Sequence, residues 1–456
     1  MRALHGTSRV AWIALLVGGT VLAGCGGAKH AAGEATRGGT INVAIVDTPN
    51  TEDLARLTPS LFTAKSHIRV NYTILDEDTL REVVGSEVPA RNRQFDVVMI
   101  GPYEAPQWGK DRYILDLTPM AASDTAYKLG DIIPSIRESL SYDGKLFASP
   151  FYGESSFLMY RKDVLKAAGI KMPARPTWEQ VAAIARLISR PGMAGICLRG
   201  KPGWGELGAT FTTVLNTFGG TWWSAKANGS VDEAMVNQAA FREALQFYVD
   251  LVRDAGEPDA TSASYNECLA QYLNGKVAMW YDATVAAGLL EADDSPVKGK
   301  NGYAPAPVER TRASGWLWSW ALAVPTTSIK RDLDWRYIAW ATGPQYIEEA
   351  GPRIPGGWAA IPPGTRRSTY EVPEYQRAAH VFIKPTLEAI ESAPVDDPGT
   401  SKRPGTPGVQ YVGIPQFQDV GDQCSGLFAA VISGRETTDS ALSNCQSIAS
   451  AAVEDP

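Results

Sequence analysis

Residues 199–206 combine side chains that could hold a small molecule. Trp204 and Glu206 alternate with glycines, and Arg199 and Lys201 come just before them. Glycine lets a backbone approach a ligand closely, and loops built in this way often carry binding residues. Planar charged groups form paired hydrogen bonds and aromatic faces pack on C–H groups, which together suit a molecule with many hydroxyls. We therefore predict that Arg199, Trp204 and Glu206 line a cleft.

The run Trp316-Leu317-Trp318-Ser319-Trp320 places three indoles at alternate positions. Side chains alternate across a strand, so the three rings are expected to share one face. Two interpretations stay open, because this face could be ordinary core or could line the cleft through Trp316 and Trp318.

Tyr103 and Glu104 follow a predicted strand, residues 95–100, through Gly101 and Pro102. Ligands of open α/β sheets bind beyond the carboxyl ends of the strands, so both residues are candidates for ligand contact. For Glu104, a place in a surface turn explains the pattern almost as well.

Apolar patterns predict the elements that position these residues. Strands are expected at 41–46, 68–74 and 95–100, with helices at 51–62 and 80–88 between them. Strands separated by helices indicate a parallel sheet of the α/β class. Farther along, Thr177 and Gln180 have the spacing of a capping box at a helix start, and residues 240–255 predict an amphipathic helix. Residues 275–281 predict a turn followed by a strand.

The chain has 456 residues and a formal net charge of −7. That length predicts a large core divided between two lobes. An acidic chain without a basic run argues against a nucleic-acid partner. Beyond residue 25 the histidines are His30, His67 and His380, and no histidine or cysteine has metal-ligand spacing. We therefore expect no metal, no cofactor and no histidine-based catalysis.

Residues 1–24 have the pattern of a signal peptide, because Arg2 and Arg9 precede a short apolar stretch that glycines interrupt. The motif Leu22-Ala23-Gly24-Cys25 follows and is similar to a bacterial lipobox. We predict lipidation of Cys25, a flexible tether over residues 25–39, and a location outside the cytoplasm, anchored to the cell membrane. The alternatives are an ordinary signal peptide with an accidental cysteine, or an N-terminal anchor helix.

Lipidation of Cys25 would leave four cysteines, an even number that permits disulfides outside the cytoplasm. Cys424 and Cys445 flank one predicted helical segment near the C-terminus, and we favour a disulfide between them. Cys197 and Cys268 could equally be buried free thiols, because cysteine packs as a small apolar residue.

Six motifs follow one another over residues 40–345: Phe95-Asp96-Val97-Val98-Met99, Leu115-Asp116-Leu117-Thr118, Tyr142-Asp143-Gly144-Lys145-Leu146-Phe147-Ala148-Ser149-Pro150, Leu158-Met159-Tyr160-Arg161-Lys162-Asp163-Val164-Leu165, Pro176-Thr177-Trp178 and Asn274-Gly275-Lys276-Val277-Ala278-Met279-Trp280. Their order and spacing resemble those of the extracellular solute-binding proteins of carbohydrate ABC importers. The last 90 residues match that family less clearly.

The resemblance implies an α/β, two-lobed, periplasmic-binding-protein-like fold of the maltose-binding-protein type, with a ligand cleft between the lobes. Lobe 1 would comprise residues 40–150 and 315–350, and lobe 2 residues 151–314 and 351–456. Glu154 would follow the first crossover, where a buried acid is costly unless it is paired or hydrogen-bonded. Asp282 stands where the family places a ligand acceptor. Arg353 lies at a possible third crossover, where it could donate to hydroxyls or pair with a carboxylate.

A narrower resemblance to the sorbitol/mannitol (polyol) branch rests on residues 195–206 and on Asn216-Thr217-Phe218-Gly219-Gly220. It implies capture of a neutral sugar alcohol or sugar, with hexitols and pentitols favoured, and delivery to the membrane subunits of an ABC importer. The alternative is a secreted carbohydrate-active enzyme of the glycosidase type, which needs two carboxyl groups about 5 to 9.5 Å apart. The sequence contains no nucleophile elbow, and we predict no catalytic residue.

Overall fold

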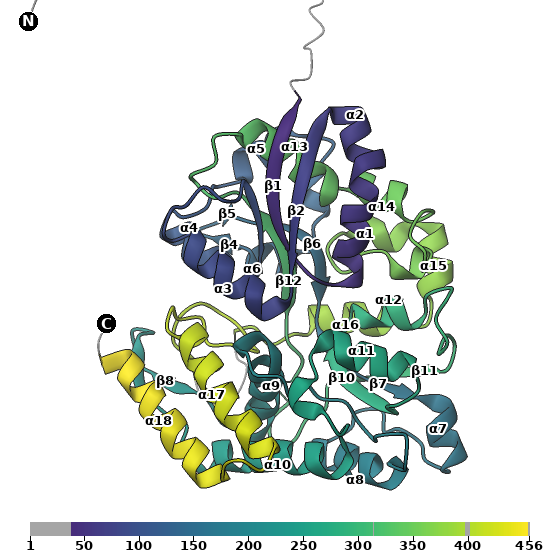
Figure 1. The fold of residues 1–456 in the computed structure, drawn as a ribbon, viewed down its shortest axis with the longest axis vertical. Helices are drawn as coiled ribbons and strands as arrows, with labels where there is room; N and C mark the ends of the chain where they lie inside the picture. The colour runs from purple at the N-terminus through teal and green to yellow at the C-terminus, as the bar shows by residue number, and fades with distance from the viewer. Residues whose placement is uncertain (1–37, 313, 397–401, 455–456) are drawn as a thin grey trace, which may run out of the picture. The chain divides into compact units, whose positions relative to one another are not determined.

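Two separate β-sheets form the framework of the chain (Figure 1). The computed structural model describes residues 38–312, 314–396 and 402–454, so the predicted signal peptide and Cys25 lie outside the described residues. The strands are β1 (Gly39–Val46), β2 (Ile68–Leu75), β3 (Val97–Ile100), β4 (Ser141–Tyr142), β5 (Lys145–Leu146), β6 (Ser149–Glu154), β7 (Ser156–Arg161), β8 (Trp223–Ala225), β9 (Val231–Ala234), β10 (Met279–Ala283), β11 (Asn301–Pro305) and β12 (Trp318–Ala323).

The first sheet has five strands in the order β2-β1-β3-β12-β6. The three predicted strands near the N-terminus are β1, β2 and β3, and β1 pairs in parallel with both of the others. β12 runs antiparallel to β3 and β6, so the sheet is mixed, although the strand and helix order predicted a parallel one. The difference arises because β12 comes from much later in the chain and lies between β3 and β6 in the sheet.

The second sheet has three strands in the order β10-β7-β11, and both outer strands are antiparallel to β7. A single residue, Ser155, connects β6 of the first sheet to β7 of the second. Its backbone N–H donates to Thr284 Oγ1 at 3.1 Å, which anchors the connection to the end of β10. Residues 306–317 make the return connection from β11 to β12.

Helices surround both sheets (Figure 1). They are α1 (Pro49–Thr58), α2 (Ala64–Ser66), α3 (Glu77–Glu87), α4 (Glu104–Lys110), α5 (Thr118–Ser123), α6 (Pro134–Ser139), α7 (Lys162–Ala167), α8 (Trp178–Ile188), α9 (Ala209–Phe218), α10 (Ala239–Ala255), α11 (Tyr265–Leu273), α12 (Ala286–Leu290), α13 (Arg331–Ala341), α14 (Pro344–Ala350), α15 (Pro373–Ala379), α16 (Ile383–Glu391), α17 (Phe417–Ile432) and α18 (Thr438–Glu454). We call the first sheet with α1–α6, α13 and α14 the first lobe, and the second sheet with α7–α12, α17 and α18 the second lobe.

Local sequence signals explain several helix boundaries. The predicted capping box at the start of α8 is formed, because Thr177 Oγ1 accepts from Gln180 N at 3.1 Å and Gln180 Oε1 accepts from Thr177 N at 3.0 Å. Together these bonds satisfy two backbone donors that the first helical turn leaves free. Ser264 and Glu267 form a second capping box at the start of α11.

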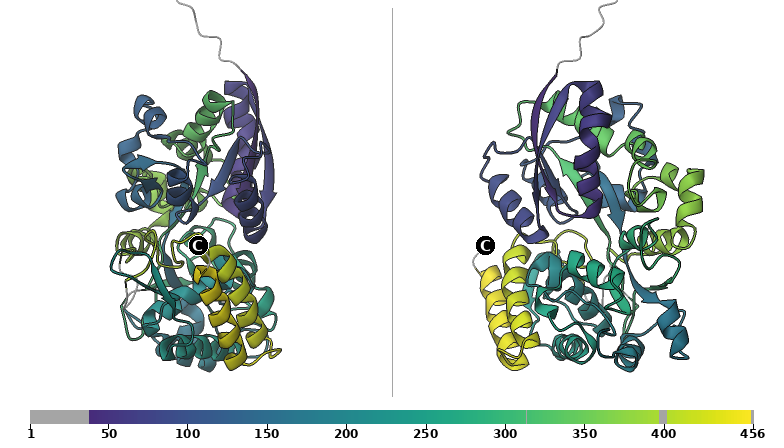
Figure 2. Two further views of the ribbon diagram at one scale, coloured as in Figure 1. Left: turned by 90° about the vertical axis from the view of Figure 1, so that its left-hand side faces the viewer. Right: turned by 45° about the vertical axis from the view of Figure 1, so that its right-hand side comes forward.

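The C-terminal part of the chain contacts both lobes. α17 packs against α10 and against α18, the two yellow helices that lie side by side in Figure 2, and a disulfide joins Cys424 to Cys445. Thr365 O instead accepts from Ile133 N at 2.8 Å on the side of the first sheet. The division predicted from the sequence had assigned all residues after 350 to lobe 2.

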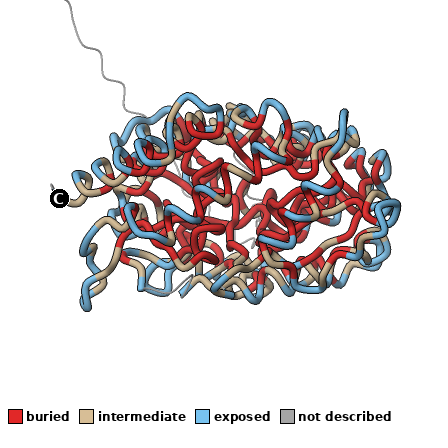
Figure 3. Tube along the Cα trace, turned by 90° about the horizontal axis from the view of Figure 1, so that it is seen from below, coloured by how far each residue is buried: buried red, intermediate tan, exposed pale blue. Residues whose placement is uncertain are grey.

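Buried residues run through the interior and exposed residues lie along the outer loops (Figure 3). Strands β3, β6, β10 and β12 are buried along their whole length, which agrees with sheets covered on both faces. Within the described residues, no helix combines the length and apolarity that a membrane crossing requires.

Candidate ligand-binding site

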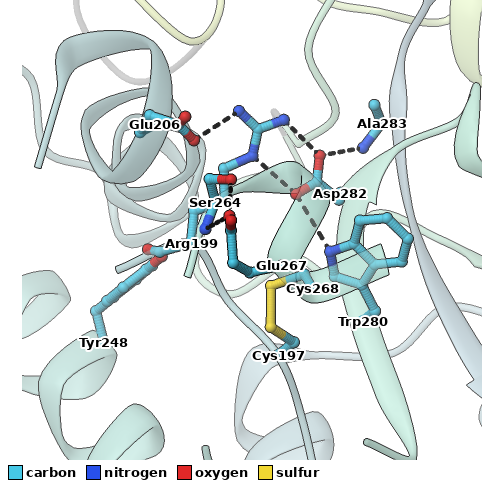
Figure 4. The surroundings of a disulfide bond; sticks show 10 residues. All are labelled: Cys197, Arg199, Glu206, Tyr248, Ser264, Glu267, Cys268, Trp280, Asp282 and Ala283. Carbon is cyan, nitrogen blue, oxygen red and sulfur yellow. Dashed lines mark hydrogen bonds and ion pairs between the residues drawn. A yellow bond between two sulfur atoms is a disulfide. The ribbon is translucent and has the colours of Figure 1, made fainter. Parts of the chain in front are cut away.

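Arg199 lies at the centre of the site, bonded to three carboxylates. Its Nε and Nη2 donate to Asp282 Oδ2 and Oδ1 at 2.9 and 2.8 Å. Its Nη1 donates to Glu206 Oε2 and to Glu77 Oε2, both at 3.3 Å. The paired bonds fix the plane of the guanidinium group (Figure 4). Burial disfavours the charged form of Arg199, but Asp282 and the other acids outweigh it and raise the arginine pKa well above its usual value.

The backbone around Arg199 explains why Asp282 meets it. Cys197 forms a parallel bridge with Trp280 at the edge of β10, so residues two positions farther along each segment become neighbours. A disulfide between Cys197 and Cys268 ties the same segment to α11. The sequence left the state of these two cysteines open, and the structure pairs them. The Asp282 carboxylate also accepts hydrogen bonds from Trp280 Nε1 at 3.2 Å and from Ala283 N at 2.7 Å.

Arg81, on α3, is enclosed by three indoles. Its guanidinium carbon lies 4.1, 4.7 and 4.8 Å from the ring centres of Trp204, Trp318 and Trp320. Cation–π attraction is strongest when the cation is removed from water, and only 7% of Arg81 is exposed. The guanidinium nitrogens of Arg81 are also hydrogen-bonded, because Nη2 donates to Glu77 Oε1 at 2.8 Å and Nη1 donates to Glu104 Oε1 at 3.1 Å.

Two adjoining cavities open beside these arginines. The cavity next to the indoles, which we call the indole cavity, is lined by Glu77, Arg81, Glu154, Arg199, Trp204, Gly205, Ala209, Trp316, Trp318, Trp320 and Gln410. A second cavity of about 240 Å³ shares four of those residues, Glu77, Glu154, Arg199 and Trp320. Among its other lining residues are Asp47, Lys201, Glu206 and Asn266. Each cavity is therefore walled by residues of both lobes.

Three residues that line the indole cavity carry buried polar atoms without a partner among the described residues. Trp204 Nε1 and Trp318 Nε1 have no hydrogen-bond acceptor among the described residues, and Gln410 Oε1 has no donor. Buried polar groups are normally paired, so these atoms mark a surface suited to a polar molecule. A hydroxyl can accept from an indole N–H and donate to an amide oxygen. The indole faces supply the apolar contact that C–H groups require.

Two buried acids complete the polar lining. Burial raises the pKa of Glu154 well above its usual value, and the positive charge of Arg199 opposes that rise only in part. Burial likewise raises the pKa of Glu206, again against Arg199. Either acid can accept a hydrogen bond from a ligand hydroxyl.

Most of the residues predicted from the sequence meet in this region. Five of them line the indole cavity, namely Glu154, Arg199, Trp204, Trp316 and Trp318. Glu206 lines the second cavity. Asp282 lines neither cavity and contacts Arg199 instead.

Besides Asp282, three other predicted residues lie outside the two cavities. Tyr103 packs its ring 4.8 Å from that of Trp204 and donates to Ile414 O at 2.9 Å. Glu104 stands behind Arg81, with its second oxygen accepting from Gly101 N at 2.9 Å. Arg353 does not join the cluster, because its side chain is exposed and donates to Glu349 O on the outer side of the first lobe.

Four polar or aromatic residues of the indole cavity were not predicted from the sequence, namely Glu77, Arg81, Trp320 and Gln410. Glu77 and Arg81 are four residues apart just after a predicted strand, which is a signal for an ion pair at a strand end. Trp320 belongs to the alternating run and could have been included with its neighbours. Gln410 had no signal, because it comes from an irregular segment whose path depends on tertiary contacts.

One cluster within the described residues has side chains of the metal-ligating type, namely Cys197, Glu257 and Cys268. Both sulfur atoms are joined to each other in the disulfide, so neither is a thiolate that could bind a metal.

The model of the family described as bacterial extracellular solute-binding protein matches residues 46–348 of this chain. The chain belongs to that family. This solute-binding protein is 37% identical over 415 residues to the mannitol-binding protein of Pseudomonas aeruginosa, covering 89% of this chain and 91% of that relative.

Solved structures give the fold. An ABC transporter solute-binding protein from Agrobacterium vitis S4 with bound D-mannitol is 38% identical, with a TM-score of 0.86 over 91% of this chain and 98% of that one. The maltose-bound T. maritima protein MalE3 is 21% identical, with a TM-score of 0.74 over 90% of this chain and 99% of that one. The two-lobed fold of the maltose-binding-protein type is therefore confirmed for this solute-binding protein.

Proposed function

We propose that this chain is the substrate-binding lipoprotein of an ABC importer and that it captures a linear polyol, with a hexitol favoured, without chemical turnover. The observation that carries the proposal is the pair of adjoining cavities, the second of about 240 Å³. They combine two buried arginines, buried acids and, among the described residues, indole N–H groups without acceptors, contributed by both lobes.

The chemistry of the cavity favours a neutral ligand with many hydroxyls. Arg81 and Arg199 are already paired with carboxylates, so they offer little free positive charge to an anion. Trp204, Trp318 and Gln410 supply unpaired donors and an acceptor at separate points, and hydroxyls along a carbon chain could satisfy them in turn. The names of two relatives support the same class of ligand, since one is a mannitol-binding protein and another was solved with D-mannitol.

Capture would occur by closure of the two lobes. We take lobe 1 as residues 40–150 and 315–350 and lobe 2 as residues 151–314 and 351–456, except that residues 151–154 belong to β6 of the first sheet and Pro363 and Thr365 bond to lobe 1. Ser155 and the return connection between β11 and β12 would act as hinges, because both connections cross between the sheets. A ligand that contacts both lobes shifts the population toward the closed form.

Lipid anchoring is part of the proposal. The motif Leu22-Ala23-Gly24-Cys25 follows a basic and apolar leader, and lipid on Cys25 would keep the protein beside the membrane subunits of its importer. Residues 25–39 would serve as the tether.

Calorimetry on ligand-stripped protein tests the ligand class. We expect mannitol or sorbitol to bind most tightly, xylitol and ribitol more weakly, and glucose, trehalose and maltose weakest. A site that bonds most hydroxyls should strongly reject a ligand that lacks one. Mass spectrometry after the titration should recover the ligand unchanged. Tight binding of a disaccharide without any response to polyols would contradict the polyol assignment, and hydrolysis of a glycoside at an enzymatic rate would favour a glycosidase instead.

A further inference from the structure

The N-terminal turn of α3, in the first lobe, meets residues 199–201 of the second lobe. Glu77 is shared between two arginines, because its Oε1 accepts from Arg81 Nη2 at 2.8 Å and its Oε2 accepts from Arg199 Nη1 at 3.3 Å. Arg81 belongs to the same helix as Glu77, whereas Arg199 belongs to the other lobe. One carboxylate therefore fixes an arginine on each side of the boundary.

Lys201 extends this contact to the neighbouring acids. Its Nζ lies 2.9 Å from Asp78 Oδ2 and 3.3 Å from Asp76 Oδ1. The side chains of Lys201 and Asp78 are each 31% exposed, whereas those of Arg199 and Glu77 are only 7% and 14% exposed. Three consecutive acids of one lobe thus face two cations of the other. The pair of Glu77 with Arg199 is buried, and the pair of Asp78 with Lys201 is partly exposed to solvent.

Two glycines bring the loop of the second lobe close to α3. A side-chain carbon placed on Gly203 would lie 2.3 Å from Asp78 Oδ1, and one placed on Gly205 would lie 2.3 Å from Glu77 Oε1. Gly203 also has a φ of +135°, a conformation that other residues adopt rarely. The loop can approach the acids only because neither position carries a side chain, so its shape is matched to the contact.

We propose that Asp76, Glu77 and Asp78 form an electrostatic latch with Arg199 and Lys201 that holds the lobes in the closed form. In this latch Glu77 is also the positioning residue that keeps Arg199 in the cavity wall. The latch rests on the proposed capture by closure. It would also set the apparent ligand affinity, because that affinity rises with the fraction of molecules in the closed form. Salt screens the exposed Lys201 pairs but leaves the buried Glu77 pair largely intact.

Interlobe distances in the absence of ligand test the latch directly. Spin labels on Ile329→Cys and Leu187→Cys would report the distance, because these exposed residues belong to different lobes. The full chain would also carry Cys25→Ser, since the other four cysteines are paired. We expect Asp78→Asn or Lys201→Gln to increase the population at longer distances. Raising salt from about 50 mM to about 1 M should do the same in the unmodified latch and have little further effect in Lys201→Gln.

Asp254→Asn is the matched control. Asp254 forms an exposed ion pair with Arg186 within the second lobe, 2.9 Å apart, so Asp254→Asn changes the net charge as Asp78→Asn does without touching the boundary. The interlobe distance distribution of Asp254→Asn should equal that of the protein with an unsubstituted latch. If Lys201→Gln, Asp78→Asn and Glu77→Gln all keep the original distribution at every salt concentration, the latch is refuted whichever ligand the protein binds.

A double-mutant cycle with mannitol tests the pairing. We expect Asp78→Asn and Lys201→Gln each to weaken binding about two- to fivefold, and the double variant to bind no more weakly than the weaker single one. Glu77→Gln should weaken binding about 30-fold or more, because it leaves Arg199 partly unpaired. Additive effects of Asp78→Asn and Lys201→Gln would overturn the pairing. Salt-dependent distances without mannitol binding would instead sustain the latch and contradict the proposed ligand.

Discussion

The Arg199 guanidinium and the Asp282 carboxylate face each other edge to edge, joined by hydrogen bonds of 2.9 and 2.8 Å. Asp282 also accepts from Trp280 Nε1 and Ala283 N, so its two oxygens receive four bonds from the protein. The resemblance to the family predicted a ligand acceptor at Asp282. In the structure its contacts hold Arg199 in the wall of the indole cavity.

Asp282→Asn should therefore weaken ligand binding through Arg199. The amide keeps the shape of the carboxylate but removes its charge and one acceptor, so the paired bond is lost. We expect a loss of about 2–4 kcal/mol in binding free energy by calorimetry with mannitol, since truncating a buried charge pair leaves its partner unpaired. Glu233→Gln, at an exposed position in β9, serves as the control. An unchanged dissociation constant in Asp282→Asn would contradict this role.

Trp204 should contribute through both its face and its N–H group. Trp204→Ala removes the ring that covers Arg81 at 4.1 Å, and we expect it to weaken binding by about 1–4 kcal/mol. Trp204→Phe keeps an aromatic face but lacks the indole donor, so its loss should be smaller. Calorimetry gives both affinities. The circular dichroism spectrum and the melting temperature of each variant check that it is folded. Equal affinities for Trp204→Ala and the parent would show that the indole cavity is not the ligand site.

The sequence predicted the parts of the fold that depend on local patterns. The period of apolar residues located β1, β2 and β3, and the capping residues Thr177 and Gln180 located the start of α8. Alternation also placed the rings of Trp318 and Trp320 together, 5.6 Å apart. These features follow from a few neighbouring residues, so a single sequence is sufficient to derive them.

The rest of the site depends on tertiary contacts. Arg81 looked like an ordinary helix residue, and only the meeting of α3 with β12 and η3 (Trp204–Gly208) encloses it in indoles. Arg353 follows a turn that resembled a crossover, but the chain there passes along the outer side of the first lobe. The mixed first sheet likewise required β12 to return from more than 200 residues beyond β3. Local spacing carries no information about such long-range pairings.

Gly101 provides the space for one wall of the indole cavity. A side-chain carbon at this position would lie 2.0 Å from Trp318 Cζ2, so Gly101→Ala must displace the Trp318 ring. We expect a loss of stability of about 1–3 kcal/mol together with a measurable loss of mannitol affinity. Gly130→Ala is the matched control, because nothing lies within 4 Å of the added carbon there. Thermal melting and calorimetry would measure the two effects, and normal affinity in Gly101→Ala would argue against a role for the Trp318 ring.

Cys25→Ser tests the proposed lipid anchor. The thiol would carry the lipid, so its replacement by a hydroxyl should prevent lipidation at this position. We expect the lipidated form to disappear, as measured by incorporation of labelled palmitate, while mannitol binding by the purified protein stays unchanged. Continued lipid incorporation in Cys25→Ser would exclude Cys25 as the modified residue.

Glu257 should make the folded state sensitive to pH near neutrality. The residue is 8% exposed beside the Cys197–Cys268 disulfide, and neither of its carboxylate oxygens accepts a hydrogen bond from another residue. Burial raises its pKa from 4.5 to about 7. Between these two values the folded state binds more protons than the unfolded state, so stability falls as pH rises. The contribution of Glu257 is fully present below about pH 4.5 and is lost as pH rises through about 7.

Glu257→Gln keeps the neutral form at every pH and should remove this loss. We expect the variant to be more stable than the parent by about 1–3 kcal/mol at pH 8 and to match it near pH 4, because only the charged carboxylate is penalised by burial. Urea denaturation at both pH values measures the difference. Glu233→Gln should be neutral at both, since that side chain is exposed. If Glu257→Gln leaves the slope of stability between pH 5 and pH 7 unchanged, the Glu257 carboxyl is not the group that titrates there.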